Sequence, residues 1–183
     1  MKRNISVIPI QALLLLGLFA TGAHAKDSAE VIDIKVDEAL ERFGKEVNGG
    51  KEFLESATGV LVFPSVLKAG FGIGGETGEG ALRVDGKTVE YYRTSAASIG
   101  FQFGAQTKMV VLVFMNDSAL KQFRDSSGWK AGVDGSIVLI EVGAAGALDT
   151  KNITDPIVGF VLTNAGLMYN LTFEGSKYAK IDR

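Results

Sequence analysis

The chain has 183 residues, a length typical of one folded domain. It contains no cysteine and one histidine, and its 19 basic and 21 acidic residues give a net charge of −2. Nucleic-acid binding needs a basic patch or stripe, and none is present, so we exclude nucleic acid as a partner.

Residues 1–25 have the pattern of a secretory signal peptide. A short basic start precedes an apolar run, Ile5–Phe19, and small residues follow at Ala23–Ala25. The apolar run is short and contains a proline, which favours a signal peptide over a transmembrane anchor. We therefore expect cleavage near Ala25/Lys26 and a single domain over residues 26–183. No cysteine is available for a lipoprotein anchor, so the expected location is periplasmic or secreted.

The mature chain offers little catalytic chemistry. The one histidine, His24, lies inside the leader, which excludes Ser-His-Asp and Cys-His catalysis and the usual zinc, haem and copper sites. Glu76 and Glu79 remain as a hypothetical acid–base pair of a carboxylate hydrolase, but acidic residues in a turn are usually only solvated. We expect no enzymatic activity, no cofactor and no metal.

An amphipathic helix is predicted at the start of the mature chain, over Glu30–Asn48. Its apolar residues recur every three or four positions, Ser28 is the expected N-cap and Gly49-Gly50 ends it. Its outer face is rich in acidic residues, which favours a helix docked on its own sheet over a membrane-surface helix. A short second helix is expected around Lys51–Ser56.

The rest of the chain is dominated by strand patterns. Asp85-Gly86 reads as a hairpin turn, and Asn116 or Asp117 is expected to cap a short helix over Ser118–Arg124. The expected strands are Val60–Phe63, stopped by Pro64, and then Gly80–Val84, Thr88–Arg93, Ser98–Ala105, Lys108–Met115, Gly132–Val142, Ile157–Thr163 and Leu167–Glu174, with a loop around Ala144–Pro156. Short connections between successive strands favour antiparallel pairing.

Glycine is concentrated in Lys68–Gly80, which holds six. Gly70–Gly75 matches G-x-G-x-x-G, but a β pattern follows instead of a helix and the Lys-Ser/Thr of a P-loop is missing, so we reject nucleotide binding. Most of the 23 glycines lie in or beside expected strands, where they permit strong curvature. The predicted fold is α+β: a strongly curved, barrel-like, mostly antiparallel sheet able to enclose an apolar cavity, with the N-terminal helix and one or two short helices packed on it.

Several motifs in order resemble the SYLF family of lipid-binding domains, which occur in bacterial envelope proteins and in eukaryotic membrane-trafficking proteins. The motifs are Lys68-Ala-Gly-Phe-Gly72, Ile99–Gln106, Val110–Phe123, Gly135-Ser136 and Gly166–Gly175. The resemblance spans roughly Val31 to Ile181. It implies a curved antiparallel sheet with packed helices, a phospholipid or fatty acid as ligand, and peripheral contact with a membrane.

Candidate lipid-contacting residues follow from chemistry and from these motifs. Lys68 with Arg83 or Arg93 is a possible cationic rim for phosphate, although single basic residues beside strands are usually solvated. Trp129 beside Lys130 suits a headgroup, although a lone tryptophan more often belongs to the core. The full set is Lys68, Phe71, Ile73, Arg83, Arg93, Trp129, Lys130, Met168 and Tyr169.

Three functions remain open on the sequence alone. The first is a non-catalytic phospholipid- or fatty-acyl-binding protein of the bacterial envelope, with an apolar ligand in or on the curved sheet. The second is an envelope structural or interaction module without a small ligand, and the third is the carboxylate hydrolase.

The leader makes a prediction that mass spectrometry tests. Expressed with its own leader in a Gram-negative host, the exported protein should begin at Lys26. The intact mass of the periplasmic fraction checks this. A membrane-bound species that still carries Leu13–Leu16 would show an anchor instead.

Overall fold

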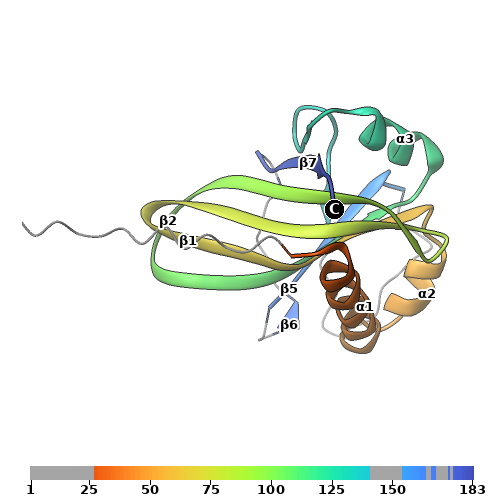
Figure 1. Ribbon diagram of the computed structural model, residues 1–183, viewed down its shortest axis with the longest axis horizontal. Coiled ribbons are helices and arrows are strands. Elements are labelled where there is room, and N and C mark those ends of the chain that lie inside the picture. The colour runs from red at the N-terminus through yellow and green to blue at the C-terminus, as the bar shows by residue number, and fades with distance from the viewer. Residues whose placement is uncertain (1–26, 141–153, 164–165, 168–172, 174) are drawn as a thin grey trace, which may run out of the picture.

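The computed structural model describes residues 27–140, 154–163, 166–167, 173 and 175–183 of the chain. It confirms the α+β class and the curved, mostly antiparallel sheet (Figure 1). The described elements are α1 (Ala29–Glu46), α2 (Gly50–Glu55), β1 (Gly59–Val84), β2 (Lys87–Phe114), α3 (Asp117–Asp125), β3 (Trp129–Lys130), β4 (Val138–Leu139), β5 (Ile157–Thr163), β6 (Gly166–Leu167) and β7 (Lys177–Ile181).

Two very long strands, β1 and β2, replace the several short strands expected from the sequence. They pair antiparallel along their whole length, from Gly59↔Phe114 to Val84↔Lys87. The predicted hairpin turn joins them: Asp85 and Gly86 have φ values of 50° and 73°, the left-handed geometry of a tight turn. Thr88–Arg93, Ser98–Ala105 and Lys108–Met115 are therefore parts of one strand.

The paired strands form a ribbon that bends back on itself (Figure 1). At the bend, Gly70 pairs with Gly104 and Gly72 with Gly100, with a register shift between them. The glycine-rich stretch is thus a strand segment that permits a sharp bend, not a loop. We call residues 59–69 with 105–114 the first limb, and residues 74–84 with 87–97 the second limb.

Pro64 does not stop its strand, contrary to expectation. Strand β1 continues through it by a bulge, because the register shifts between Phe63 and Val66. A bulge leaves residues without a ladder partner, so the missing N–H of proline costs nothing there.

Strand β2 lies at the centre of the sheet. Its first-limb part, Met109–Phe114, pairs with β5, and its second-limb part, Tyr91–Ser95, pairs with β7. The strand expected over Gly132–Val142 is reduced to the short β3 and β4, and β4 pairs with β5 in parallel. Of Leu167–Glu174, only Leu167 in β6 and residue 173 are described, and the loop around Ala144–Pro156 lies mostly outside the described residues. β7 was not predicted.

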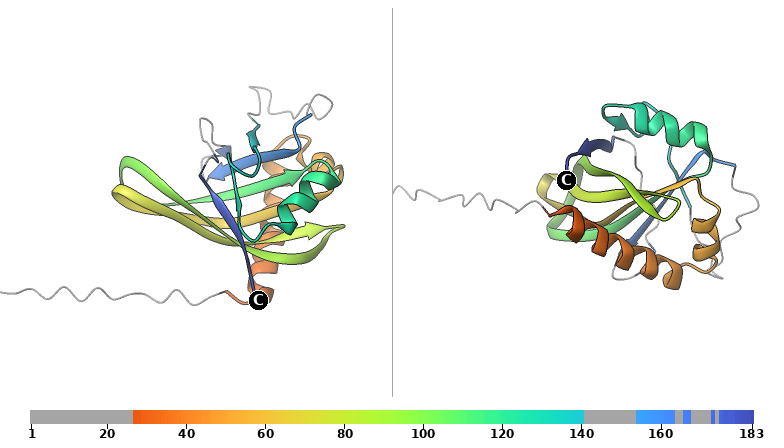
Figure 2. Two further views of the ribbon diagram at one scale, coloured as in Figure 1. Left: turned by 90° about the horizontal axis from the view of Figure 1, so that it is seen from above. Right: turned by 45° about the vertical axis from the view of Figure 1, so that its right-hand side comes forward.

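Both faces of the sheet are covered. One buried cluster joins α1 and α2 to Val60, Val62, Val111 and Val113, and a second joins α3 to Leu61, Phe63, Leu112 and Phe114. Alternate residues of the same strands therefore enter opposite cores. Figure 2 shows α1 and α2 on one side of the sheet and α3 on the other.

The three helices agree with their local sequence signals to within two residues at each end. Ser28 caps α1 through the backbone N–H of Val31, and Asn116 caps α3 through that of Ala119. Ile32, Val36 and Phe43 of the predicted stripe are buried. Helix α1 therefore lies against the sheet, as its acidic outer face predicted.

The two limbs touch where Gly78 and Gly80 cross the start of β1. A Cβ at Gly80 would lie 1.9 Å from the carbonyl oxygen of Val62, and a Cβ at Gly78 would lie 2.7 Å from that of Ser65. Real side chains do not approach backbone this closely. Glycine is thus required here for space, not for a left-handed φ.

We predict that Gly80→Ala destabilises the fold. The added methyl group must displace backbone, which costs roughly 1–3 kcal/mol and lowers Tm by several degrees. Thermal unfolding followed by circular dichroism measures this. Gly75→Ala is the matched control in the same strand, because its Cβ would lie an ordinary 3.7 Å from the carbonyl oxygen of Ala96. Equal Tm values for the two variants would contradict the close crossing.

Candidate functional site

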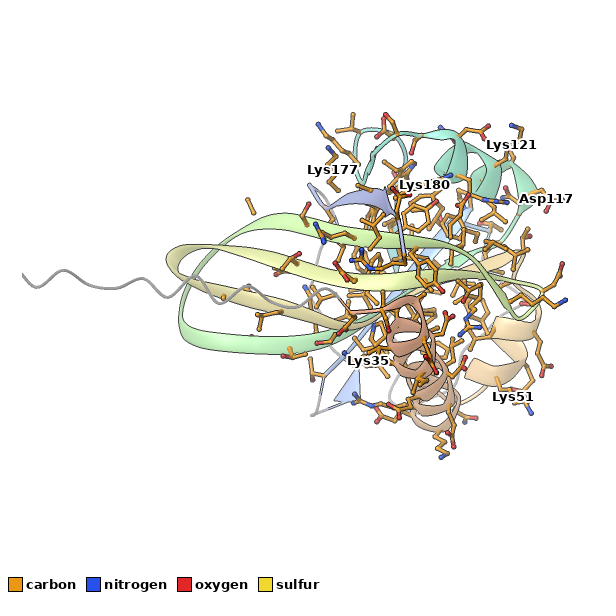
Figure 3. All side chains as sticks on the ribbon, in the orientation of Figure 1. Lys35, Lys51, Asp117, Lys121, Lys177 and Lys180 are labelled. Carbon is orange, nitrogen blue, oxygen red and sulfur yellow. The ribbon has the colours of Figure 1, made fainter. Side chains whose placement is uncertain are left out.

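Helix α1 covers the sheet through one narrow stripe, and a surface cavity opens on each of its flanks. We call them the Arg93 cavity, of about 530 Å³, and the Arg83 cavity, of about 630 Å³. Both lie within the size range of small-ligand sites in proteins. Lys35 and Lys51, which line the Arg93 and Arg83 cavities respectively, mark their separate positions in Figure 3.

The Arg93 cavity lies between the N-terminal half of α1 and the crossing of the two limbs. Its apolar wall consists of Ile32, Pro64 and Leu67, so the bulge in β1 forms part of it. Its other lining residues are Asp27, Lys35, Ser65, Thr77, Gly78, Glu79, Arg93 and Thr107.

A carboxylate shared by two arginines lies at the Arg93 cavity. Nη2 of Arg93 and Nη2 of Arg183 both lie 2.5 Å from Oε1 of Glu79. Arg93 comes from the neighbouring strand, and Arg183 follows β7. Burial alone would raise the pKa of the Glu79 carboxyl, but the guanidinium groups of Arg183 and Arg93 outweigh burial and hold that pKa below its usual value. Glu79 is therefore ionised at neutral pH and unsuited to the role of general acid.

The Arg83 cavity lies between α1, α2 and the Asp85-Gly86 turn. Its apolar wall consists of Leu40, Leu54, Ala57 and Val60. The remaining lining residues are Asp37, Glu41, Gly44, Lys45, Lys51, Glu55, Thr58, Gly59, Arg83, Asp85 and Gly86.

At this cavity, Arg83 of β1 forms ion pairs with α1. Its Nη2 lies 2.7 Å from Asp37 Oδ1 and 3.7 Å from Asp33 Oδ1. The Asp33 carboxylate also accepts hydrogen bonds from Thr88 at 2.6 Å and from Tyr91 at 2.9 Å. Burial and this contact with Asp33 raise the pKa of the Tyr91 hydroxyl. Arg83 thus has two carboxylate partners.

Lys68 joins the two limbs instead of standing free. Glu76 of the second limb lies 2.6 Å from Lys108 Nζ and 3.7 Å from Lys68 Nζ, both on the first limb. Lys68, Arg83 and Arg93 therefore belong to three separate ion-pair groups, and the structure does not bring them together into one rim.

Trp129 and Lys130 occupy very different surroundings. The indole of Trp129 is buried, with its ring centroid 5.5 Å from that of Phe123 and 6.0 Å from that of Tyr178, so we assign Trp129 to the core. The Lys130 side chain is exposed, and its backbone N–H donates to Asp134. Phe71 and Ile73 lie in β1, but their side chains lie outside the described residues, as do Met168 and Tyr169 entirely.

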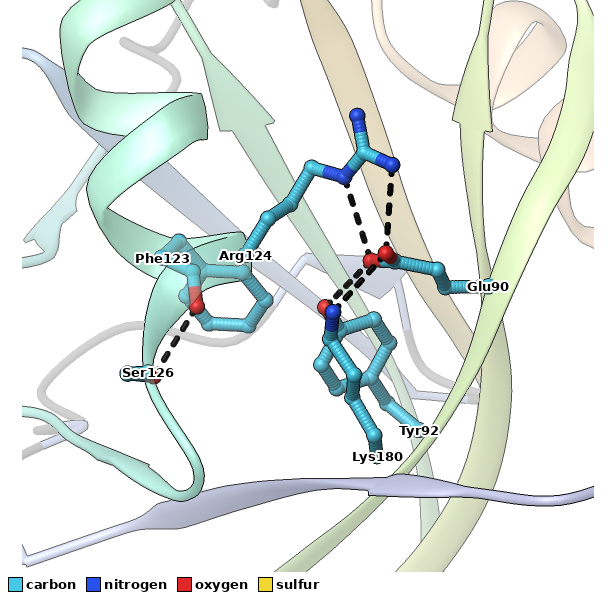
Figure 4. A network of polar contacts seen from close by, with 6 residues as sticks. All are labelled: Glu90, Tyr92, Phe123, Arg124, Ser126 and Lys180. Atoms are coloured by element: carbon cyan, nitrogen blue, oxygen red, sulfur yellow. Dashed lines mark hydrogen bonds and ion pairs between the residues drawn. The ribbon is translucent and has the colours of Figure 1, made fainter.

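A second shared carboxylate, Glu90, ties α3 to the sheet (Figure 4). It receives Nε and Nη2 of Arg124 at 3.2 and 3.1 Å, Nζ of Lys180 at 2.8 Å and the hydroxyl of Tyr92 at 2.7 Å. Burial alone would raise the pKa of Glu90, but these contacts lower it overall. Both carboxylate oxygens of Glu90 already have two protein partners each, so we interpret the network as structural.

Sequence reasoning missed two features of this region. Arg183 gave no signal, because its role depends on the pairing of β7 with β2. The Pro64 bulge, which lines the Arg93 cavity, was interpreted as the end of a strand. No helix in the described part of the chain is long and apolar enough to span a membrane.

Comparison with known proteins gives one family. Residues 95–182 match the model of the family described as Ysc84, Las17-binding protein actin regulator. This match begins within β2 and includes β7, so it covers residues 95–114 of the central strand and all of α3. No curated protein matches the chain.

We predict that Glu79→Gln destabilises the protein at neutral pH and that the effect fades in acid. Because the folded-state pKa of Glu79 lies below the unfolded value of about 4.3, its stabilisation is complete above that value and is lost as pH falls through the folded pKa. Loss of the charge should cost about 1–3 kcal/mol at pH 7. Urea unfolding of both proteins between pH 7 and pH 3 measures the difference.

The control is Glu41→Gln, which removes a fully exposed carboxylate paired with Lys45 on α1. Such surface pairs contribute little, so the effect of Glu41→Gln on stability should be smaller at pH 7. If the loss of unfolding free energy in Glu79→Gln stays constant down to pH 3, the result would contradict an ionised, arginine-bound Glu79.

Proposed function

The chain belongs to the Ysc84 (SYLF) family, and from this membership we propose that it is a non-catalytic protein that binds phospholipids or fatty-acyl chains. The ligand's hydrocarbon lies in a cavity beside α1, on the curved sheet. The family description itself names a Las17-binding actin regulator and no lipid. The lipid is thus our proposal for this chain.

The observation that carries the proposal is the pair of partly apolar cavities. Each is of ligand size and is walled by aliphatic side chains: Ile32 and Leu67 in the Arg93 cavity, Leu40 and Leu54 in the Arg83 cavity. Leu40, Leu54 and Leu67 are only partly buried, so a ligand would remove their remaining apolar surface from water. Burial of this kind contributes about 0.8 kcal/mol per methylene group.

The absence of histidine and cysteine from residues 26–183 supports a binding role without catalysis. The pattern of residues 1–25 supports export to the bacterial envelope. In that location the protein would meet acyl lipids at a membrane surface and hold them away from water.

A second candidate function is an interaction module without a small ligand. The description of the matched family, which names a protein partner, favours it. Under this alternative the cavities would be filled only by water, and the outer surface would bind the partner. The two functions differ in one simple respect, which is whether the purified protein carries lipid.

We predict that organic extraction of the purified mature protein, followed by mass spectrometry, recovers acyl lipid in near-stoichiometric amount. Affinity for added fatty acids should rise with chain length and change little between low and high salt, because apolar burial exceeds Coulomb attraction for a mature chain with net charge of about −4. Lys68→Ala should leave affinity nearly unchanged. A steep loss of binding with salt would contradict this and favour a surface-charge mechanism.

Two matched variants show which cavity is used. Leu67→Glu places a charge in the wall of the Arg93 cavity, and Leu54→Glu places one in the Arg83 cavity. Both leucines are partly exposed, so both variants should fold. If the wild-type extracts contain no lipid and added fatty acids do not bind, the interaction module is the better function.

A further inference from the structure

Residues 74–80 of β1 contribute no side chain to either buried cluster. We call them the edge segment, because β1 pairs only with β2 among the described strands. Four of its seven residues are glycine, and the other three are Glu76, Thr77 and Glu79. The edge segment therefore lacks the core packing that holds the neighbouring Ala81 and Leu82 in place.

The edge segment contacts the first limb through its backbone and one carboxylate. A Cβ at Gly78 would lie only 3.0 Å from the Cα of Val66, so the edge segment covers Val66, which is 2% exposed. The carboxylate of Glu76 lies 2.6 Å from Nζ of Lys108 and 3.7 Å from Nζ of Lys68. Among the described residues, these two ion pairs are the only ones between the edge segment and the first limb.

Glu79, the other acidic residue of the edge segment, has no ion pair with the first limb among the described residues. Its partners are Arg93 of the second limb and Arg183, which follows β7. Contact between the limbs at this point therefore depends on Glu76 and on glycines that bury little apolar surface. A segment held in this way opens locally at a lower free energy than the whole domain unfolds. Glycines at both ends of the segment permit the backbone rotations of such an opening.

The Arg93 cavity lies at this contact between the limbs. Its lining includes Thr77, Gly78 and Glu79 of the edge segment and Pro64, Ser65 and Leu67 of the first limb. We propose that the edge segment is a gate of the Arg93 cavity and that Glu76 fastens it to the first limb. A ligand enters and leaves the cavity when the segment lifts from Val66. This inference rests on the proposed lipid function for the ligand, and it adds the control of ligand exchange.

Two single cysteines test whether the gate opens, since the chain has no thiol of its own. Val66→Cys places a thiol under the edge segment, and Val111→Cys places one in the first limb at a site that is 0% exposed. Labelling by dithionitrobenzoate under native conditions should be roughly tenfold or more faster for Val66→Cys, because only local opening is needed there. Equal labelling rates of the two variants would overturn the gate.

Two matched substitutions then test the fastening. Glu76→Gln weakens the closed state and should raise the labelling rate of Val66→Cys about tenfold. Glu90→Gln also removes a carboxylate that joins two basic side chains, but outside the edge segment. The contacts of Glu90 persist while the gate is open, so Glu90→Gln should leave the Val66→Cys rate nearly unchanged. Equal acceleration by both substitutions would show that only global unfolding exposes residue 66, and would overturn the gate.

Ligand exchange gives a second readout. Stopped-flow fluorescence with cis-parinarate, a fluorescent fatty acid, measures the association and dissociation rates separately. Both processes pass through the open gate, so Glu76→Gln should raise both rates about tenfold and change Kd much less. Faster dissociation with an unchanged association rate would assign Glu76 to direct ligand contact and overturn the gate.

The two readouts separate the gate from the proposed function. If cis-parinarate does not bind to the folded wild-type protein, the lipid function fails, and thiol labelling alone decides whether the segment opens. If cis-parinarate binds but Glu76→Gln changes neither labelling nor exchange, the gate fails and the lipid function stands. Circular dichroism checks folding. If Glu76→Gln proves unfolded, the comparison of Val66→Cys with Val111→Cys still decides the matter.

Discussion

The structure depends on a contact between two parts of one strand. At Gly80 the second limb of β1 lies so close to the carbonyl oxygen of Val62 that no side chain fits between them. This crossing keeps the folded-back ribbon closed, and Glu76 reinforces it through Lys108 and Lys68. It also forms the Arg93 cavity, since Gly78 and the bulge at Pro64, both at the crossing, line it. Fold and candidate site therefore share one requirement, the absence of side chains at the crossing.

In the described part of the chain, buried side chains and helices cover both faces of the curved sheet. Phe63, Phe114, Phe123 and Trp129 fill the side that faces α3, while α1 and α2 cover the other side. Among the described residues, ligand space is found instead along the flanks of α1, where a helix about 10 Å wide cannot cover a broader sheet. The prediction of a curved, barrel-like sheet was correct, and large aromatic residues pack against its described part on the side of α3.

Short-range sequence signals correctly predicted the helices, their caps and the hairpin turn. Interactions within a few residues determine the apolar stripe of α1, the helix caps at Ser28 and Asn116, and the turn at Asp85-Gly86. All of these features are present in the structure. The continuity of β1 could not be predicted in this way, because a proline and six glycines signal breaks unless the partner strand is known. Gly70 and Gly72 are tolerated in a strand since Gly104 and Gly100 lie opposite. Arg183 was missed for the same reason: its partner Glu79 is distant in sequence and is reached only through β7.

The ion pairs show how basic residues contribute to the fold of an acidic protein. Lys68, Lys108 and Arg83 are each engaged by a carboxylate, so their charges hold elements together and are unavailable to a ligand. The Glu76, Glu79 and Glu90 groups each join two basic side chains to one carboxylate. Ten methylene groups, at about 0.8 kcal/mol each, provide far more free energy than a charged hydrogen bond, at about 1.5–3 kcal/mol. Under the proposed lipid function, the hydrocarbon therefore determines how tightly an amphiphile is held.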